Sequence, residues 1–379
     1  MLPNVLLLLV AVVALALSLL TVAHVPVAVN WKLAVLAGEF GYALAVVPLG
    51  VLAARLACGG SLLLTVTTVV LCVAAIWLFL RPVVQAWQIG RGLPAQLGAA
   101  FGPATFSFGP FSLRKLLRVI PPNGQMQTHT FAPGLALDLY PANPSSPIGM
   151  PVTCVIAIHG GGWDGGDRRQ LAGFNHWLAR QGYAVAAISY RLAPTHPWPA
   201  QRDDVLAAIA WLKTHAPELG FDPARLVLLG RSAGGQIATA VGYLGDPAIR
   251  GVVALYAPHD MRFVWSVSRS DDALNSLKLM RQIMGGPPEG REALYDSASG
   301  QALVRRGVTP PTLLLHGTID TLSWVRHSRR LEAALREAQV SHVFVELPWA
   351  THGFEVNLGG PGGQLTAFAL TWFLAAVSK

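Results

Sequence analysis

The chain contains few charged residues and few cysteines for its length. Of its 379 residues, 13% are charged and 53% are hydrophobic, whereas an average soluble domain carries roughly 25% charged residues. The three cysteines, Cys58, Cys72 and Cys154, lack the spacing of a disulfide framework or of a zinc site. This composition excludes a disordered, fibrous or disulfide-stapled protein, and it is too apolar for a wholly soluble one.

Clusters of basic charge are also absent. Lys and Arg outnumber Asp and Glu by 28 to 20, for a formal net charge of +8, but the cations are scattered. A nucleic-acid-binding domain normally carries a basic stripe or a recognisable motif. We therefore expect no nucleic-acid partner, and we attribute the excess charge to the flanks of membrane segments, which meet an anionic lipid surface.

Long apolar runs fill residues 1–80, where Lys32, Glu39 and Arg55 are the only charged side chains. The runs cover residues 5–23, 33–54 and 62–80, and each approaches the roughly 20 residues that a helix needs to cross a bilayer core. We expect residues 1–81 to form a membrane anchor of three transmembrane helices. A cleaved signal peptide is the alternative for the first run, which lacks a basic residue ahead of its apolar core.

The cations that flank these runs predict an orientation. With three spans, Lys32 lies on the same side as Arg81 and the basic residues that follow it, whereas Arg55 lies with the amino terminus. Because cytoplasmic loops are enriched in Lys and Arg, we expect a multi-pass protein of the cell membrane with a cytoplasmic carboxyl-terminal domain. Glu39, inside the second run, is expected to be a bundle-facing or interfacial structural carboxylate rather than a functional one.

The remainder divides into a linker and an α/β domain. Residues 82–125 are rich in Gly, Pro, Ala and Phe and include a short basic amphipathic piece at 111–117, which suggests a linker that lies against the bilayer. Residues 126–379 alternate short β-branched runs with helical patterns. The strands VTCVIAIH and RLVLLG are continuously apolar, as burial on both faces of a parallel sheet requires.

The expected fold is therefore a three-layer α/β/α sandwich around a mostly parallel sheet. Its strands are expected at 135–140, 152–159, 184–190, 226–230, 251–256, 312–316 and 342–347. Its helices are expected at 167–181, 199–215, 233–244, 323–338 and 363–377. An insertion at about 259–310 interrupts the alternation and is a candidate lid.

Gly230-Arg231-Ser232-Ala233-Gly234 fits G-x-S-x-G, the turn that exposes a nucleophilic serine between a strand and a helix. A buried strand precedes it and a helix of small residues follows it, so Ser232 is the candidate nucleophile. The alternative role for Ser232, a simple helix N-cap, is disfavoured because strand, turn and helix occur together in the order that the motif requires.

His159-Gly160-Gly161-Gly162-Trp163 supplies a glycine loop after the preceding strand. Acyl transfer builds negative charge on a carbonyl oxygen, which backbone N–H groups can stabilise. The expected donors are Gly161 and Gly162, completed by Ala233. The loop also fits the dinucleotide pattern G-x-G-x-x-G, but the next strand ends in Ser-Tyr-Arg instead of the acidic residue that binds a ribose.

The acid and the base of a serine triad should follow Ser232 in that order. Asp320 lies in the loop after one buried strand and His352 in the loop after the next. His352 would take the serine proton, while Asp320 would orient the imidazole. Asp260 is the alternative acid, and His316 is the alternative base.

Aromatic residues near these loops are candidates for the wall of an apolar substrate pocket, although plain packing is the commoner role. They are Trp163, Trp198, Phe263, Trp265 and Trp324.

Taken together, the motifs HGGGW, SYRLAPTHPWPAQRDD, FDPARLVLLGRSAGG, HGTID and THGF resemble the α/β-hydrolase fold, specifically its hormone-sensitive-lipase-like branch of bacterial acetyl esterases and lipases. The likeness covers about residues 135–377. It implies hydrolysis of carboxylic esters by a serine nucleophile, without metal or cofactor.

The resemblance implies a role for each matching residue. Ser232, Asp320 and His352 match the triad; Gly161, Gly162 and Ala233 match the oxyanion hole; His159, with Gly160 and Trp163, would brace the oxyanion loop. The chain departs from the family pattern at Ser189 and Thr195, where acidic residues are common, which puts substrate preference in doubt more than reaction type.

The leading hypothesis is a membrane-anchored serine esterase that acts on a small or lipid-borne ester. An arylformamidase uses a very similar glycine loop, and a peptidase of the prolyl-oligopeptidase type shares the order of the triad but lacks that loop. A membrane scaffold that retains a hydrolase fold without activity is the alternative outside enzymes.

Overall fold

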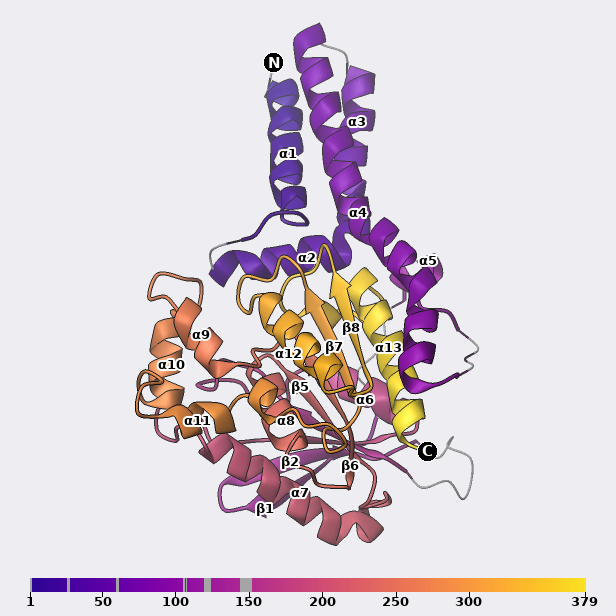
Figure 1. Ribbon diagram of the computed structural model, residues 1–379. Helices are drawn as coiled ribbons and strands as arrows, with labels where there is room; N and C mark the ends of the chain where they lie inside the picture. The colour runs from indigo at the N-terminus through magenta and orange to yellow at the C-terminus, as the bar shows by residue number, and fades with distance from the viewer. Residues whose placement is uncertain are drawn as a thin grey trace.

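The computed structural model describes residues 2–25, 28–58, 61–104, 106, 108–118, 124–143 and 152–379. Figure 1 shows an α/β domain from which a stalk of helices rises at one edge of the sheet. The stalk contains the amino terminus, whereas the carboxyl terminus lies on the α/β domain.

An eight-stranded sheet in the order β1-β2-β4-β3-β5-β6-β7-β8 forms the centre of the domain. Its strands are β1 (Gln127–Ala132), β2 (Leu135–Tyr140), β3 (Cys154–Ile158), β4 (Ala184–Ile188), β5 (Leu226–Arg231), β6 (Ile249–Leu255), β7 (Thr312–Gly317) and β8 (His342–Leu347). The strands from β3 to β8 are parallel, whereas β1 and β2 pair antiparallel at one edge. The predicted mostly parallel sheet is confirmed, with β1 as an additional strand.

Helices cover both faces because the central strands are apolar on both sides. Ile156 and Leu228 face a core that includes α7, α8 and α12, whereas Val155 and Val227 face a core that includes α6 and α13. The bounds of these helices are α6 (Ala172–Arg180), α7 (Ala200–Leu219), α8 (Ala233–Gly242), α12 (Arg326–Glu337) and α13 (Pro361–Val377). This two-sided burial is the hydrophobic arrangement that a parallel sheet requires.

The expected insertion between β6 and β7 is present as short helices. They are α9 (Met261–Val267), α10 (Ser276–Met284), α11 (Glu292–Ser297) and a 3-10 turn (Gly300–Leu303). Helix α10 buries Leu279, Met280 and Ile283 against the domain. The insertion therefore forms part of the core on the α8 side of the sheet.

Helix α4 (Leu62–Phe101) is much longer than the predicted third span. Its second half packs against α13, where Ala86, Leu93 and Leu97 are fully buried. Gly90 packs closely against Pro110 and Leu365, where a Cβ atom would lie 3.3 Å and 3.6 Å from their side chains. The expectation that residues 82–125 form a linker against the bilayer is therefore wrong for 82–101, whose small residues serve helix packing instead.

The rest of that segment is only partly described. A short helix, α5 (Leu113–Leu116), occupies the basic amphipathic piece. Residues 105, 107 and 119–123 of the expected linker lie outside the described residues.

The second apolar run does not form one straight helix. It divides into α2 (Ala28–Leu44) and α3 (Val46–Cys58), which meet at a bend of 49°. Pro48 lacks the N–H group that would bond the Leu44 carbonyl, and this explains a break at that point. Helix α3 joins α1 (Leu2–Leu19) and the first half of α4 in the stalk, whereas α2 lies across the top of the α/β domain (Figure 1).

By length and composition, α4 is the one described helix that can cross a membrane, or one of two if the bent pair α2 and α3 counts as a span. Helix α1 is apolar but shorter. The first predicted span thus corresponds to the short helix α1, the second to the bent pair α2 and α3, and the third to the first part of the long helix α4.

Glu39 fastens α2 to the α/β domain. Its carboxylate accepts hydrogen bonds from the N–H of Gly362 at 2.9 Å and from Trp349 Nε1 at 3.2 Å. Its backbone carbonyl accepts from Asn357 Nδ2 at 2.9 Å. These contacts join Glu39 to the start of α13 instead of the helix bundle, because the unpaired N–H groups at that helix end need an acceptor.

Because the second half of α4 is buried, we expect substitutions of two leucines on that helix to differ in their effect on the free energy of unfolding. Leu97 is fully buried against the α/β domain, whereas Leu80 is exposed near the base of the stalk. We expect Leu97→Ala to lower the free energy of unfolding by about 2–5 kcal/mol, because it leaves a cavity, and Leu80→Ala to have a much smaller effect. Urea denaturation of the detergent-solubilised protein, followed by tryptophan fluorescence, measures both. Equal losses in the two variants would contradict the packing of α4.

Candidate active site

A strained turn places Ser232 between β5 and α8. Ser232 has φ 53° and ψ −123°, a backbone conformation that is unfavourable for a residue with a side chain. A Cβ atom on Gly230 would lie 2.1 Å from the Gly234 carbonyl oxygen, and one on Gly234 would lie 2.3 Å from that of Ile158. Both flanking glycines are therefore required by the geometry of this turn.

The glycine loop follows β3 and lies beside Ser232. Gly161 and Gly162 have positive φ angles of 124° and 60°. Within the described ranges, the N–H groups of Gly161, Gly162 and Ala233 donate to no protein acceptor, whereas that of Gly160 donates to Gln170 Oε1 at 2.8 Å. Three free donors next to a serine form the arrangement that can stabilise an oxyanion.

His159 and Trp163 brace this loop at its two ends. The His159 ring donates from Nδ1 to the Gly160 carbonyl at 2.8 Å and stacks on Tyr190 at 4.1 Å between ring centroids. Burial lowers the pKa of His159, so the ring is neutral at neutral pH. Trp163 Nε1 donates to Gln236 Oε1 at 2.8 Å. The loop is thereby tied to the core on both sides.

Asp320 and His352 meet at the carboxyl ends of β7 and β8. His352 Nδ1 donates to Asp320 Oδ2 at 2.7 Å, while Asp320 Oδ1 accepts the N–H groups of Leu322 at 2.9 Å and Ser323 at 3.1 Å. Burial alone would raise the pKa of Asp320, but His352 and His316 beside it hold that pKa well below its ordinary value. An ionised carboxylate in this position fixes the imidazole tautomer and stabilises the imidazolium.

Asp260 and His316, the alternative acid and base, are engaged in contacts away from Ser232. Asp260 caps α9 by accepting from the N–H of Phe263 at 3.1 Å and pairs with Arg330 at 2.6 Å. His316 is fully buried between the Ser328 hydroxyl and the Ser323 carbonyl, each at 2.7 Å. Neither residue lines the cavity that contains Ser232.

Ser232 and His352 face the same cavity, which has a volume of about 560 Å³. Gly160, Gly161 and Gly162 line it as well. No hydrogen bond joins Ser232 to His352 in the part of the chain that the structure describes, and such contacts commonly tighten only when substrate binds. The cavity thus brings together the residues that the sequence motifs selected separately.

Helix α2 supplies part of the same cavity, through Trp31, Lys32 and Val35. The Trp31 ring stands edge-on to His352, with centroids 6.3 Å apart and an interplanar angle of 86°. Sequence reasoning assigned these residues to the membrane anchor. No local signal identifies them, because the contact joins positions more than 300 residues apart.

The five aromatic residues suggested as a pocket wall do not line this cavity. Trp163 and Trp198 are buried, and their indole N–H groups bond Gln236 and Ser297. The aromatic residues that do line it are Trp31 and Tyr256. Proximity in sequence to the catalytic loops was therefore a poor guide to the pocket wall.

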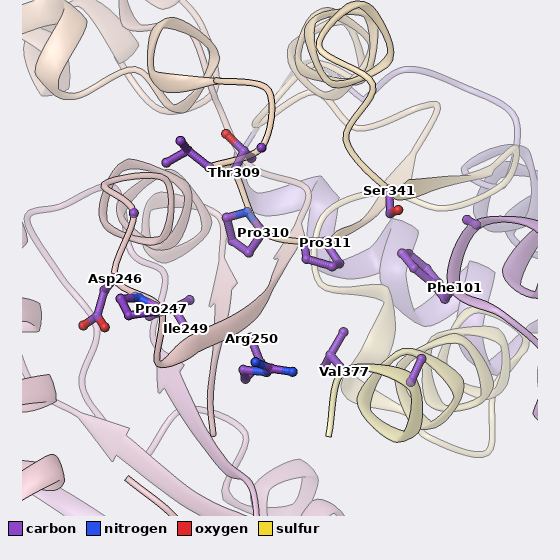
Figure 2. A pocket seen from close by; sticks show the side chains of 15 residues that line it. Phe101, Asp246, Pro247, Ile249, Arg250, Thr309, Pro310, Pro311, Ser341 and Val377 are labelled. Carbon is purple, nitrogen blue, oxygen red and sulfur yellow. The ribbon is translucent and has the colours of Figure 1, made fainter. Parts of the chain in front are cut away.

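A second large cavity, of about 640 Å³, lies at the opposite edge of the sheet (Figure 2). It is lined by Arg250 near the start of β6, Pro311 before β7, Ser341 before β8 and Phe101 of α4. Asp246, at its rim, pairs with Lys213 at 2.6 Å. No histidine lines this cavity in the described part of the chain, whereas the paired His352 and Asp320 lie at the carboxyl edge with Ser232.

A serine on a strained turn, free amide donors beside it and a paired His and Asp, all on a parallel sheet, define an α/β-hydrolase. The chain belongs to the BD-FAE family, whose model matches residues 137–335. Within the described ranges, no group of three His, Cys, Asp or Glu residues is arranged to hold a metal ion.

Two mycobacterial relatives with esterase names agree with the assignment to the α/β-hydrolases. The chain is 28% identical over 301 residues to the probable carboxylic ester hydrolase LipM of Mycobacterium tuberculosis, covering 75% of this chain and 67% of LipM. It is 31% identical over 247 residues to esterase LipC of the same organism, covering 60% of this chain and 59% of LipC, less than two thirds of that protein. These relatives place the chain among the carboxylic ester hydrolases.

Solved structures show the same fold. Esterase B from Lactobacillus Rhamnosis (HN001) superposes with a TM-score of 0.57 at 24% identity, over 79% of this chain and 95% of that one. The predicted α/β-hydrolase fold is thus confirmed, and the mycobacterial relatives confirm the esterase class. The finer likeness to the hormone-sensitive-lipase branch stays a prediction.

Because Asp320 contacts His352 and Asp260 does not, we expect substitutions of these two aspartates to have different effects on kcat. We expect Asp320→Asn to lower kcat for a p-nitrophenyl ester by about 10⁴, because the imidazole loses its orienting carboxylate. Asp260→Asn, in which a helix cap is altered away from the cavity, should keep kcat within tenfold of the parent. Stopped assays on the purified full-length protein measure both, and the reverse ranking would transfer the acid role to Asp260.

A pH dependence of stability follows from the histidines buried behind Asp320. Burial, together with neighbouring His316, lowers the pKa of His327 from 6.5 to about 3. Between these values the unfolded chain binds a proton that the folded protein does not, so stability falls as the pH drops from about 6.5. We expect His327→Gln to flatten this decrease in urea denaturation series between pH 7 and 4. An unchanged slope would contradict the burial of a neutral His327.

Proposed function

We propose that this chain is a membrane-anchored serine carboxylesterase in which Ser232, His352 and Asp320 form the triad. The observation that carries the proposal is the convergence, in one cavity, of the strained Ser232, the Asp320-bound His352 and the glycine loop. These elements come from β5, β8, β7 and β3, so their meeting reflects the fold and not local sequence.

The chemistry follows from this geometry. Ser232 Oγ attacks the ester carbonyl while His352 Nε2 takes its proton, and the N–H groups of Gly161, Gly162 and Ala233 receive the oxyanion. The imidazolium then protonates the leaving alcohol, which departs from the acyl-enzyme. A water molecule, deprotonated by His352, attacks the acyl carbon; the bond to Ser232 Oγ then breaks, His352 returns the proton to that oxygen, and the carboxylic acid leaves.

Exposed apolar side chains support a membrane anchor in the stalk. They include Leu6, Leu9 and Val13 of α1, Val46, Leu49 and Leu56 of α3, and Leu62, Leu63, Val66 and Val70 of α4. The 18 residues of α1 span about 27 Å and residues 62–81 of α4 about 30 Å, which matches a hydrocarbon core. Polar side chains in the stalk pair with one another, as Arg55 does with Asn4 at 2.7 Å.

The polar residues of the stalk support an orientation in which the α/β domain lies in the cytoplasm. Arg55 and Asn4 mark the tip, whereas Arg81 at the base donates to the Thr21 carbonyl at 3.1 Å. Lys32 and Arg91 lie on the side of the α/β domain, so the excess of cations is on that side. This distribution favours a cytoplasmic catalytic domain, and a phosphatase reporter fused after Lys379 that is active outside the cytoplasm would contradict it.

The triad predicts that one substitution removes the activity. We expect the full-length protein in detergent to hydrolyse p-nitrophenyl butyrate and to be labelled by a fluorophosphonate, and Ser232→Ala to lose both without loss of folding. Ser266→Ala, at an exposed position of α9, is the matched control and should retain both.

Parallel assays separate the alternatives. Turnover of N-formylkynurenine in preference to every ester tested would indicate an arylformamidase. A folded parent protein that neither turns over substrate nor reacts with fluorophosphonate would indicate a non-catalytic scaffold.

A further inference from the structure

Helix α2 belongs both to the proposed anchor and to the active site. Trp31, Lys32 and Val35 occupy one face of its first half and line the cavity of Ser232 and His352. The exposed fraction of Val35 is only 9%, and the Trp31 ring meets the His352 ring edge-on. The pocket is therefore incomplete in the α/β domain alone.

Both catalytic loops hold this helix in place. Thr321, next to Asp320, donates from Oγ1 to the Val25 carbonyl at 2.6 Å, just before α2. On the His352 loop, Trp349 bonds Glu39, and its ring lies against Gly38. The position of α2 is thus fixed relative to Asp320 and His352, and Trp31 has a defined place beside the imidazole.

Helix α2 also carries exposed apolar side chains that do not line the cavity. Leu33 and Leu36 have exposed fractions of 43% and 38%, whereas Ala34 and Ala37, the residues that follow each of them, are buried. Helix α2 follows α1 in the chain and meets α3 at the 49° bend, and it lies at the base of the stalk across the carboxyl ends of β7 and β8 (Figure 1). A helix in this position, with exposed apolar side chains, is suited to the boundary between headgroups and acyl chains.

The cavity itself is suited to an apolar chain. Its lining includes Leu279 and Leu322 in addition to Trp31 and Val35, and two of its members, Leu274 and Val356, are exposed by 39% and 50%. Exposed apolar residues at the mouth of a pocket indicate contact with an apolar phase. Because α2 forms one wall, the cavity lies on the side of the domain from which the stalk rises (Figure 1).

We propose that the substrate is a long-chain acyl ester resident in the bilayer, of the acylglycerol type, and that it reaches Ser232 along α2 with its acyl chain against Trp31 and Val35. This inference rests on the proposed function, because it requires both the serine chemistry and the membrane anchor. It assigns to the anchor a specificity role in addition to attachment. Trp31 is then a substrate-contacting residue.

The test uses the full-length protein in phosphatidylcholine nanodiscs with two substrates, 1,2-dioleoylglycerol in the disc and p-nitrophenyl acetate in solution. We expect hydrolysis of both by the parent. Trp31→Ala should lower kcat/KM for dioleoylglycerol at least tenfold more than kcat/KM for p-nitrophenyl acetate, because a long acyl chain loses far more contact with this wall than a two-carbon acyl group does. Trp31→Phe should recover most of the loss.

Trp211→Ala is the matched control, since Trp211 stacks on His215 on α7, remote from the cavity; it should leave the ratio of the two activities unchanged. Equal loss on both substrates in Trp31→Ala, no loss on either, or a parent that cleaves p-nitrophenyl acetate but not dioleoylglycerol would overturn the inference while the proposed function stands. A parent that cleaves neither substrate and resists fluorophosphonate would instead refute the proposed function.

Discussion

The tight turn between β5 and α8 is the constraint on which the rest of the site depends. Ser232 can occupy it only because Gly230 and Gly234 allow backbone atoms to approach where side chains would collide. The same approach brings the start of α8 against the end of β3, so that Gly160 lies beside the Ser232 side chain. One turn therefore sets the position of the nucleophile and of the amides that would receive the oxyanion.

A buried ion pair connects this turn to the histidine loop. Arg231, next to Ser232, bonds Glu355 at 2.9 Å, and the Tyr256 hydroxyl donates to the same carboxylate oxygen at 2.5 Å. The Tyr256 ring lies 4.3 Å from the ring of His352. Buried ion pairs contribute little net stability but can enforce a single arrangement, and this one holds the nucleophile turn and the base loop in a common register.

The sequence predicted the centre of the domain well, because its signals there are local. Continuously apolar strands such as β3 and β5 indicate burial on both faces, and G-x-S-x-G after a strand identifies the turn at Ser232. The order of loops then selected Asp320 and His352, which the structure pairs. Strand β1 was missed because its sequence, QTHTFA, is largely polar and none of its residues is buried at the edge of the sheet.

The anchor was predicted less well, since apolar sequence does not distinguish lipid contact from protein contact. The second half of α4 and the face of α2 that carries Trp31 are apolar because they pack on the α/β domain, not because they meet lipid. The bend before α3 depends on Pro48, whose effect on direction is set by tertiary contacts. Pocket residues contributed by such a helix cannot be found from local patterns.

The central claim is that Ser232 forms the covalent intermediate with its oxyanion in the glycine loop and its acyl chain along α2. An experimental structure of the full-length protein in nanodiscs, after reaction with a long-chain alkylphosphonate, tests it most directly. The account predicts a phosphorus bond to Ser232 Oγ, a phosphonyl oxygen at about 2.7–3.1 Å from the amides of Gly161, Gly162 and Ala233, and the alkyl chain against Trp31. An adduct on another residue, or a phosphonyl oxygen directed away from those amides, would contradict it.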